Sequence, residues 1–242
     1  MYHAILFLPL IGALFAGLFG RFVGARACEI VTTSLMFVAA FLSWIAFYQV
    51  AIEGNDIRIA LIGFMQSGTF ETYWSIRVDT LTAVMLVVVN TVSSLVHLYS
   101  VGYMDHDPHR ERFFSYLSLF TFAMLALVTA DDLVQLFFGW EGVGLASYLL
   151  IGFWYKKPSA NAAAIKAFVV NRVGDFGFLL GIFTVFYVFG AVQYDTIFAA
   201  AEGKVDTTIT CLSWEVPAME LMCFLLFMGA IGKSAQFLLH TW

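Results

Sequence analysis

Long runs of apolar residues, separated by short polar segments, form the main pattern along this chain. A helix needs about 20 apolar residues to cross the roughly 30 Å hydrocarbon core of a bilayer. Seven runs reach or approach that length: residues 2–19, 30–50, 81–99, 113–130, 133–155, 162–192 and 216–242. The pattern therefore predicts an all-α protein, a polytopic bundle of about seven transmembrane helices.

The longest polar interval, residues 51–78, predicts a different kind of element. Its stretches at 57–62 and 72–78 are rich in β-branched and aromatic residues, and Ser67-Gly68 lies between them. This arrangement is typical of two strands joined by a turn. We therefore expect a small β-hairpin outside the membrane.

Short motifs near the borders of the runs predict where helices begin and how they pack. The Asp131-Asp132 pair precedes a run and predicts a turn followed by a helix N-cap. Pro217 is well placed for the first turn of the last helix. Gly177 and Gly181 form a small-xxx-small pair, which is more typical of close helix packing than of a functional site.

Composition and charge agree with a membrane protein. The chain is 61% hydrophobic and 12% charged, whereas soluble domains average roughly 45–50% apolar and about 25% charged residues. No basic block suggests binding to nucleic acid. Basic residues favour alternate loops, and the two sets are Arg21, Arg26, Arg110, Arg112, Lys156 and Lys157 against Arg58, Arg77 and Lys204. The positive-inside rule then places the N-terminus and the hairpin on the outer side.

No cofactor is expected on this chain. Cys28, Cys211 and Cys223 have no paired spacing, which argues against a disulfide framework, a zinc site or an iron–sulfur cluster. No glycine-rich dinucleotide loop is present. His106 and His109 lie in a loop with metal-binding residue types, but no second cluster completes a metal site.

Ionisable residues fall deep inside three of the predicted helices, where a charge costs at least about 2.5–3.5 kcal/mol. Glu141 lies near the middle of 133–155 without a basic residue within one turn, so it needs a partner on another helix or is a neutral, hydrogen-bonded side chain. Lys233 lies roughly 24 Å into the last run at 1.5 Å per residue. A lysine whose carboxylate partner can move is a natural proton carrier, whereas a permanent salt bridge would only fix helix packing.

Further polar residues lie on the same or neighbouring segments. Arg172 and Asp175 are spaced i, i+3, so they share a helix face and can pair, either for function or purely for structure. His240 follows Lys233 by less than two turns and is a relay candidate because imidazole titrates near neutral pH. Lys166 lies one turn inside 162–192 and could extend to the inner surface.

Four motifs together closely resemble the largest antiporter-like subunit of respiratory complex I, which is subunit L in bacteria and subunit 5 in mitochondria. The motifs are VDTLT at 78–82, GWEGVGLASYLLIGF at 139–153, NRVGD at 171–175 and GKSAQ with a following HTW at 232–242. They occur in the family's order over nearly the whole chain. One departure is Phe237-Leu238, where many relatives have a proline.

The resemblance implies an antiporter-like fold of inverted five-helix repeats with flanking helices. Residues 1–112 would then form the flanking helices with the outer hairpin at about 51–78. Residues 113–242 would form the first part of the proton-translocating repeat, with a broken and truncated seventh helix at its end. The sequence stops at Trp242 inside an apolar run, which also predicts that the chain is the first part of a longer protein.

The resemblance also implies roles for the buried charges. Glu141 and Lys233 would form the pair that sets the lysine's affinity for a proton, with Asp175 and Arg172 beside it. The function would be proton translocation within NADH:quinone oxidoreductase, while NADH, FMN, iron–sulfur clusters and quinone would bind to partner subunits. His240 and Lys166 would be possible relays.

Two other functions have to be weighed. A subunit of a sodium/proton antiporter complex, or of a membrane-bound hydrogenase, would share the fold and the Glu–Lys pair. A scaffold bundle would use its ionic residues for packing alone. The expected partners are other membrane-arm subunits and the lipid bilayer, and the expected location is a bacterial inner membrane or, alternatively, a mitochondrial one.

Overall fold

The computed structural model describes residues 1–68, 70–211 and 213–242, and most of them are helical. Six of the described helices are long and apolar enough to cross a membrane. The first span combines α1 (Tyr2–Leu14), a π-helical turn (Phe15–Phe19) and α2 (Gly20–Val23), and the second combines α3 (Ala25–Phe47) with a π-helical turn (Tyr48–Ile52). The others are α4 (Thr80–Tyr103), α5 (Arg110–Val128), α6 (Leu133–Ile151) and α7 (Pro158–Phe189).

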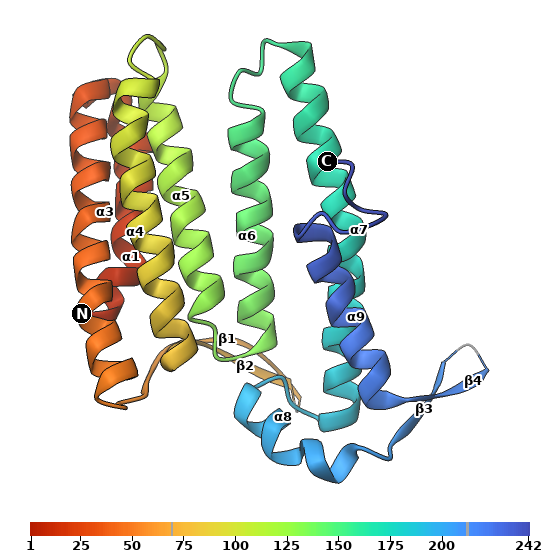
Figure 1. The fold of residues 1–242 in the computed structure, drawn as a ribbon. Coiled ribbons are helices and arrows are strands. Elements are labelled where there is room, and N and C mark those ends of the chain that lie inside the picture. The colour runs from red at the N-terminus through yellow and green to blue at the C-terminus, as the bar shows by residue number, and fades with distance from the viewer. Residues whose placement is uncertain (69, 212) are drawn as a thin grey trace.

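The seventh predicted helix is much shorter than the apolar run that predicted it, residues 216–242. It is α9 (Ala218–Lys233), which has 16 residues and ends at Lys233. The chain then continues through turns to Trp242. In Figure 1, α9 rises beside α7 and stops partway along it, so the predicted broken helix is confirmed.

Figure 1 shows how the helices are arranged. Helices α1, α3, α4 and α5 form one group, which we call the flanking group, and α6 connects it to the pair formed by α7 and α9. The connection between α5 and α6 lies at one end of the bundle, and the α4–α5 and α6–α7 loops lie at the other. The loops predicted to be inner and those predicted to be outer therefore lie at opposite ends of the bundle, which we call the inner end and the outer end after that prediction.

The predicted hairpin forms at the outer end and is longer than its two sequence stretches indicated. Strand β1 (Ile57–Ser67) pairs antiparallel with β2 (Phe70–Val78), from the Ile57–Val78 pair to the Ser67–Phe70 pair. Gln135 fixes the hairpin to the start of α6, because its side chain accepts a hydrogen bond from Ser75 N at 3.0 Å and donates one to Ser75 O at 2.7 Å.

Other elements at the outer end had no clear sequence signal. They are α8 (Tyr194–Ala201), a short 3₁₀ turn (Glu202–Lys204), and the strand pair β3 (Thr208–Cys211) and β4 (Trp214–Pro217). They connect α7 to α9, and they lie at the same end as the hairpin (Figure 1). Strands of four residues are too short to show a clear alternation of polar and apolar positions.

Aspartate side chains cap two of the helices, as predicted for α6, whereas Pro217 lies just outside the helical turn predicted for it. Asp132 caps α6, since its carboxylate accepts from Gln135 N at 2.7 Å, and Asp79 caps α4 in the same way from Thr82 N at 2.9 Å. Burial raises the pKa of Asp132. Pro217 is the residue before α9 rather than part of its first turn.

The inside of the flanking group is polar towards the inner end. His97 of α4 is fully buried; its Nε2 lies 3.1 Å from Ser118 Oγ and its Nδ1 lies 2.8 Å from Ser93 O. Ser93 Oγ in turn lies 2.6 Å from Thr121 Oγ1. Because both ring nitrogens have partners, this histidine joins α4 to α5 inside a low-dielectric core.

We expect His97→Leu to destabilise the protein by roughly 1–3 kcal/mol, since it leaves buried hydroxyl groups without their partner. His106→Leu is the matched control, because His106 is exposed in the α4–α5 loop and surface changes of this kind stay within about 0.5 kcal/mol. The measurement is the thermal unfolding midpoint in detergent. Equal shifts for both variants would contradict a structural role for His97.

Candidate functional site

Glycines allow α7 and α9 to approach closely. A Cβ added at Gly177 would lie 2.6 Å from Met228 Cβ, and one at Gly181 would lie 2.9 Å from Leu226 Cδ2. The predicted role of these two glycines in packing is therefore confirmed. The close approach places the last turn of α9, which carries Lys233, beside the middle of α7.

Asp175 is the most buried charged residue of this region, with 3% of its surface exposed. Its Oδ1 accepts a hydrogen bond of 2.6 Å from Nε1 of Trp140, a residue of α6. The Trp140 ring stacks on Phe178 of α7 with a centroid distance of 4.9 Å. Trp140 was not among the predicted site residues. Its position next to Glu141 in the longest motif could have indicated that it belongs to the site.

Arg172 connects the two carboxylates. Its guanidinium contacts the carboxylate of Glu141 on α6, and its Nη1 lies 3.8 Å from Oδ2 of Asp175 on its own helix. The predicted i, i+3 pair thus exists and extends to Glu141. Glu141 has the interhelical partner that its position required, but that partner is Arg172 rather than Lys233. Since α6 packs against α7 at this level, Arg172 is the nearest cation.

Lys233 lies at the C-terminal end of α9, close to the same cluster. Its Nζ is 5.7 Å from the centroid of the Trp140 ring and 2.9 Å from the place that a Cβ on Gly144 would occupy. Among the residues that the structure describes, no carboxylate lies within 4 Å of this amine. Lys233, Asp175, Arg172 and Asn171 line a cavity of about 10 Å³, room for roughly one water molecule.

The break after Lys233 is built from backbone features. Gly232 packs against Gly174, with 3.4 Å between an added Cβ and the Gly174 Cα. Ala235 and Leu238 then adopt positive φ values of 49° and 81°, which ends the regular helix. Trp242 Nε1 donates to Gly232 O at 3.0 Å. The break therefore forms without the family's proline.

The two predicted relays lie outside this cluster. His240 is exposed, and its ring stacks on Phe237 with a centroid distance of 6.3 Å. Lys166 is exposed on α7, about 9 Å before Arg172 at 1.5 Å per residue. Within the described part of the chain, neither side chain makes a hydrogen bond or ion pair with the four central residues.

A second ionic cluster, which the sequence did not predict, lies at the outer end. Arg77 of the hairpin reaches Asp131 at 3.3 Å and Asp195 at 3.1 Å, and Arg58 also contacts Asp195. The hydrogen bond from Arg58 lowers the pKa of Asp195. This cluster ties the hairpin to the α5–α6 turn and to α8.

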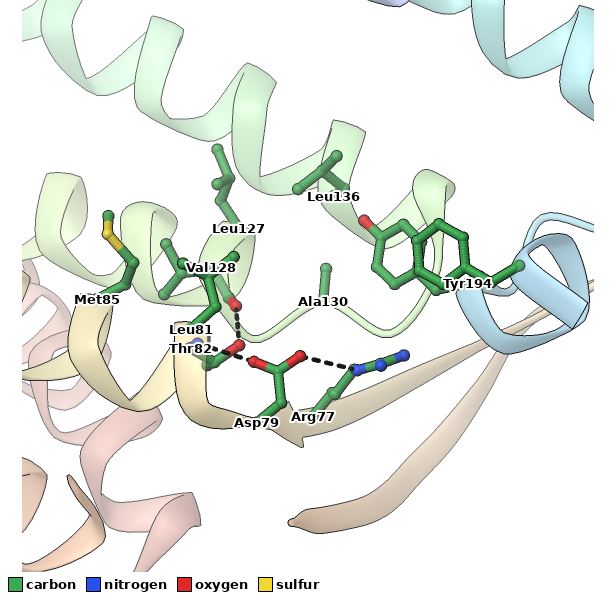
Figure 2. Close-up of a pocket in the computed structure, with 11 residues that line it drawn as sticks. Arg77, Asp79, Leu81, Thr82, Met85, Leu127, Val128, Ala130, Leu136 and Tyr194 are labelled. Carbon is green, nitrogen blue, oxygen red and sulfur yellow. Dashed lines mark hydrogen bonds and ion pairs between the residues drawn. The ribbon is translucent and has the colours of Figure 1, made fainter. Parts of the chain in front are cut away.

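A cavity of about 320 Å³ adjoins the outer cluster (Figure 2). Figure 2 shows Asp79 between Thr82 and Arg77, with Tyr194 across the cavity. The Asp79–Arg77 contact measures 3.4 Å. Burial opposes the charge on Asp79, but the hydrogen bonds from Thr82 and the nearby Arg77 outweigh burial and lower its pKa. The other walls of the cavity are mainly apolar. Its polar residues therefore attach the hairpin to α4 and do not form a polar path for protons.

The described residues offer no cluster of three or more potential metal ligands. Cys28 is buried and Cys223 is exposed, both as free thiols, and the side chain of Cys211 lies outside the described part. The ionisable groups of the site are a lysine, an arginine and two carboxylates, which lie between three helices.

Two family models match the chain. "NADH:quinone oxidoreductase/Mrp antiporter, TM" covers residues 130–242, and "NADH-Ubiquinone oxidoreductase (complex I), chain 5 N-terminus" covers residues 64–114. Subunit L of the NADH-quinone oxidoreductase of Rhodobacter capsulatus is 56% identical over 98% of this chain and 34% of its own length. Chain 5 of the NADH-ubiquinone oxidoreductase of Triticum aestivum is 52% identical over 100% of this chain and 36% of its own.

Solved structures have the same fold at low sequence identity. A chain of the archaeal membrane-bound sulfane sulfur reductase has a TM-score of 0.81 at 19% identity, covering 100% of this chain and 47% of its own length. A chain of the Mrp complex from Dietzia sp. has a TM-score of 0.78 at 21% identity, covering 100% and 24%.

The six helices long enough to span a membrane, the broken helix and the ionic cluster between α6, α7 and α9 define an antiporter-like membrane subunit. The chain spans about a third of the length of the curated relatives it matches. It belongs to the family of NADH-quinone oxidoreductase subunit L and NADH-ubiquinone oxidoreductase chain 5.

Proposed function

We propose that this chain belongs to a proton-translocating membrane subunit of NADH:quinone oxidoreductase. The observation that carries the proposal is the ionic cluster of Glu141, Arg172 and Asp175 at the end of α9, with Lys233 beside it and unpaired within the described residues. Ionisable groups at membrane depth are expensive and typically mark ion paths. NADH, FMN, iron–sulfur clusters and quinone would bind to partner subunits, so this chain would contribute to an enzyme without a redox site of its own.

In the proposed mechanism, Lys233 is the group that takes up and releases the proton. A carboxylate near an amine favours its protonated form, and withdrawal of the carboxylate favours release. Arg172 holds Glu141 in the arrangement described above. If Glu141 exchanges Arg172 for Lys233, the lysine gains a counter-charge and binds a proton; the reverse exchange releases it.

Trp140 and Asp175 hold the geometry of this exchange. The hydrogen bond from Trp140 keeps Asp175 oriented on α7 and fixes the Trp140 ring beside the amine of Lys233. The cavity shared by Lys233 and Asp175 would admit a water molecule to connect them. His240 and Lys166 would act farther along the path, outside the cluster.

Membership of this family also suggests the domain organisation, the partners and the membrane of the protein. We propose that residues 1–112 are flanking helices and that residues 113–242 begin the translocating repeat. The partners would be other membrane-arm subunits and the bilayer, in a bacterial inner membrane or, alternatively, a mitochondrial one. A subunit of a sodium/proton antiporter complex is the second candidate, since one matching family model includes Mrp antiporters.

Ion identity separates the two candidates. With the full-length protein in its purified complex, reconstituted in proteoliposomes, we expect NADH oxidation to acidify or alkalinise the lumen at the same rate in sodium chloride and in choline chloride. Lysine and carboxylate groups bind protons directly and need no sodium. The measurement is the quenching of a pH-sensitive dye. A gradient that forms only with sodium would overturn the proposal in favour of the antiporter.

A further inference from the structure

A basic and aromatic cavity lies at the inner end, between the α4–α5 and α6–α7 loops. Its volume is about 240 Å³, and its walls are Asp107, Pro108, His109, Arg112 and residues 153–157. The aromatic residues Phe153, Trp154 and Tyr155 stand at the end of α6, where the helix would leave the membrane. Tryptophan and tyrosine collect at such interfaces because their rings are apolar and their edges polar.

Positive charge in this cavity exceeds negative charge. Arg112 lies over the ring of Phe153 at 4.7 Å and that of Tyr155 at 5.1 Å, and Lys157 lies over Trp154 at 4.7 Å. In the described ranges, no carboxylate lies within 4 Å of the charged groups of Arg112, Lys156 or Lys157.

The acidic residue of the cavity, Asp107, is already engaged. Its Oδ1 accepts from His109 N at 2.8 Å and its Oδ2 accepts from Trp154 Nε1 at 2.9 Å. Arg112 has one bond, from Nη2 to Phe153 O at 3.0 Å, while its Nε is buried without a partner among the described residues. The cavity thus has unused donors, while both oxygens of its one carboxylate already accept a hydrogen bond, and this arrangement suits an anion.

A second cavity continues from the first along the helices. Its volume is about 260 Å³, it shares Arg112, Phe153 and Tyr155, and it extends to Tyr116 of α5 and Leu149 of α6. Tyr116 is about 6 Å from Arg112 along α5 at 1.5 Å per residue. This part of the surface therefore leads from the charged interface towards the apolar core of the membrane.

We propose that the two cavities together bind one anionic phospholipid of the inner leaflet. The phosphate would lie against Arg112, Lys156 and Lys157, and part of an acyl chain would lie along Tyr116 and Leu149. Arginine suits phosphate because its planar fork can donate two parallel hydrogen bonds. Basic pockets between transmembrane helices on the inner side favour anionic headgroups. A free phosphate ion would use the first cavity alone, so the second cavity favours a lipid.

The test uses the full-length protein in its purified complex, placed in phosphatidylcholine nanodiscs that contain a trace of photoactivatable phosphatidylglycerol. We expect crosslinks in the peptides around residues 112–116 and 148–157. Lys156→Gln with Lys157→Gln should reduce this labelling by about thirtyfold, because each lysine near an anionic headgroup contributes about 1 kcal/mol and every 1.4 kcal/mol is a factor of about ten. Arg21→Gln with Arg26→Gln removes the same charge from exposed positions at the same membrane face and should leave the labelling unchanged.

Four results would overturn the assignment. Equal labelling in the lysine variant and the parent would show that the cations do not hold the lipid. Equal loss in the two double variants would show that only the overall charge of the surface matters. Displacement of the lipid by inorganic phosphate, or crosslinks at this place to a neighbouring subunit instead of lipid, would assign the cavity to another occupant. None of these results would bear on proton translocation.

Discussion

Lys233→Met should reduce NADH-driven proton movement into proteoliposomes by at least about tenfold while the complex still assembles. The reason is that methionine keeps the length and apolar stem of lysine and removes the amine that binds the proton; loss of a positioned acid–base group typically costs a hundredfold or more in a proton-transfer step. The amine lies beside the Trp140 ring and shares a cavity with Asp175, and Lys233 is the lysine among the described residues that lines this cavity.

The controls separate transport from packing. Lys204→Met changes a lysine of the outer segment that follows α8 and should leave proton movement unchanged. Glu141→Gln keeps the size of its side chain but removes the charge that Arg172 contacts, so it should also impair transport. If both Lys233→Met and Glu141→Gln pump normally, the cluster has no role in transport. If both fail to assemble, it is a scaffold.

The second large effect concerns the contact between α5 and α6. A Cβ added at Gly139 would lie 2.5 Å from the backbone nitrogen of Leu127 and 2.6 Å from its Cα. Backbone atoms cannot move aside as a side chain can, so Gly139→Ala should destabilise the protein by roughly 1–3 kcal/mol. It should also impair transport, because the displaced turn of α6 carries Glu141.

Gly102→Ala is the matched control for that substitution. Gly102 is also helical, in α4, and an added Cβ would meet no atom within 4 Å. The favourable helix propensity of alanine should then stabilise the protein by up to about 1 kcal/mol. Thermal unfolding in detergent measures both variants. Shifts in the same direction would show that the close approach of α5 and α6 is unimportant.

Sequence patterns predicted most of the fold because membrane spans follow from local composition. The runs that became α3 to α7 were evident, as was the hairpin from its two stretches around Ser67-Gly68. The end of α9 was less evident from hydropathy, since residues 234–242 continue an apolar run. The motif around Lys233 indicated the break, and backbone packing of Gly232 accounts for it.

The sequence named the four ionisable residues that the structure brings together, but it gave only one of their contacts. Spacing within a helix shows which side chains share a face, and so it gave Arg172 with Asp175. It does not show which face of α6 meets α7, and the contact of Glu141 with Arg172 therefore came only from the structure. The same limit explains the outer cluster, in which Arg77 meets Asp195 across 118 positions of the chain.

The position of Lys233 as the last residue of α9 has an electrostatic consequence of its own. The aligned peptide dipoles of a helix leave a partial negative charge of roughly half an electron at its C-terminus, and this charge stabilises a cation there. Lys233 therefore has a fixed counter-charge that no side-chain movement can withdraw. This charge favours the protonated amine in both arrangements of Glu141, so the exchange of Glu141 between Arg172 and Lys233 adds to a constant contribution from the end of α9.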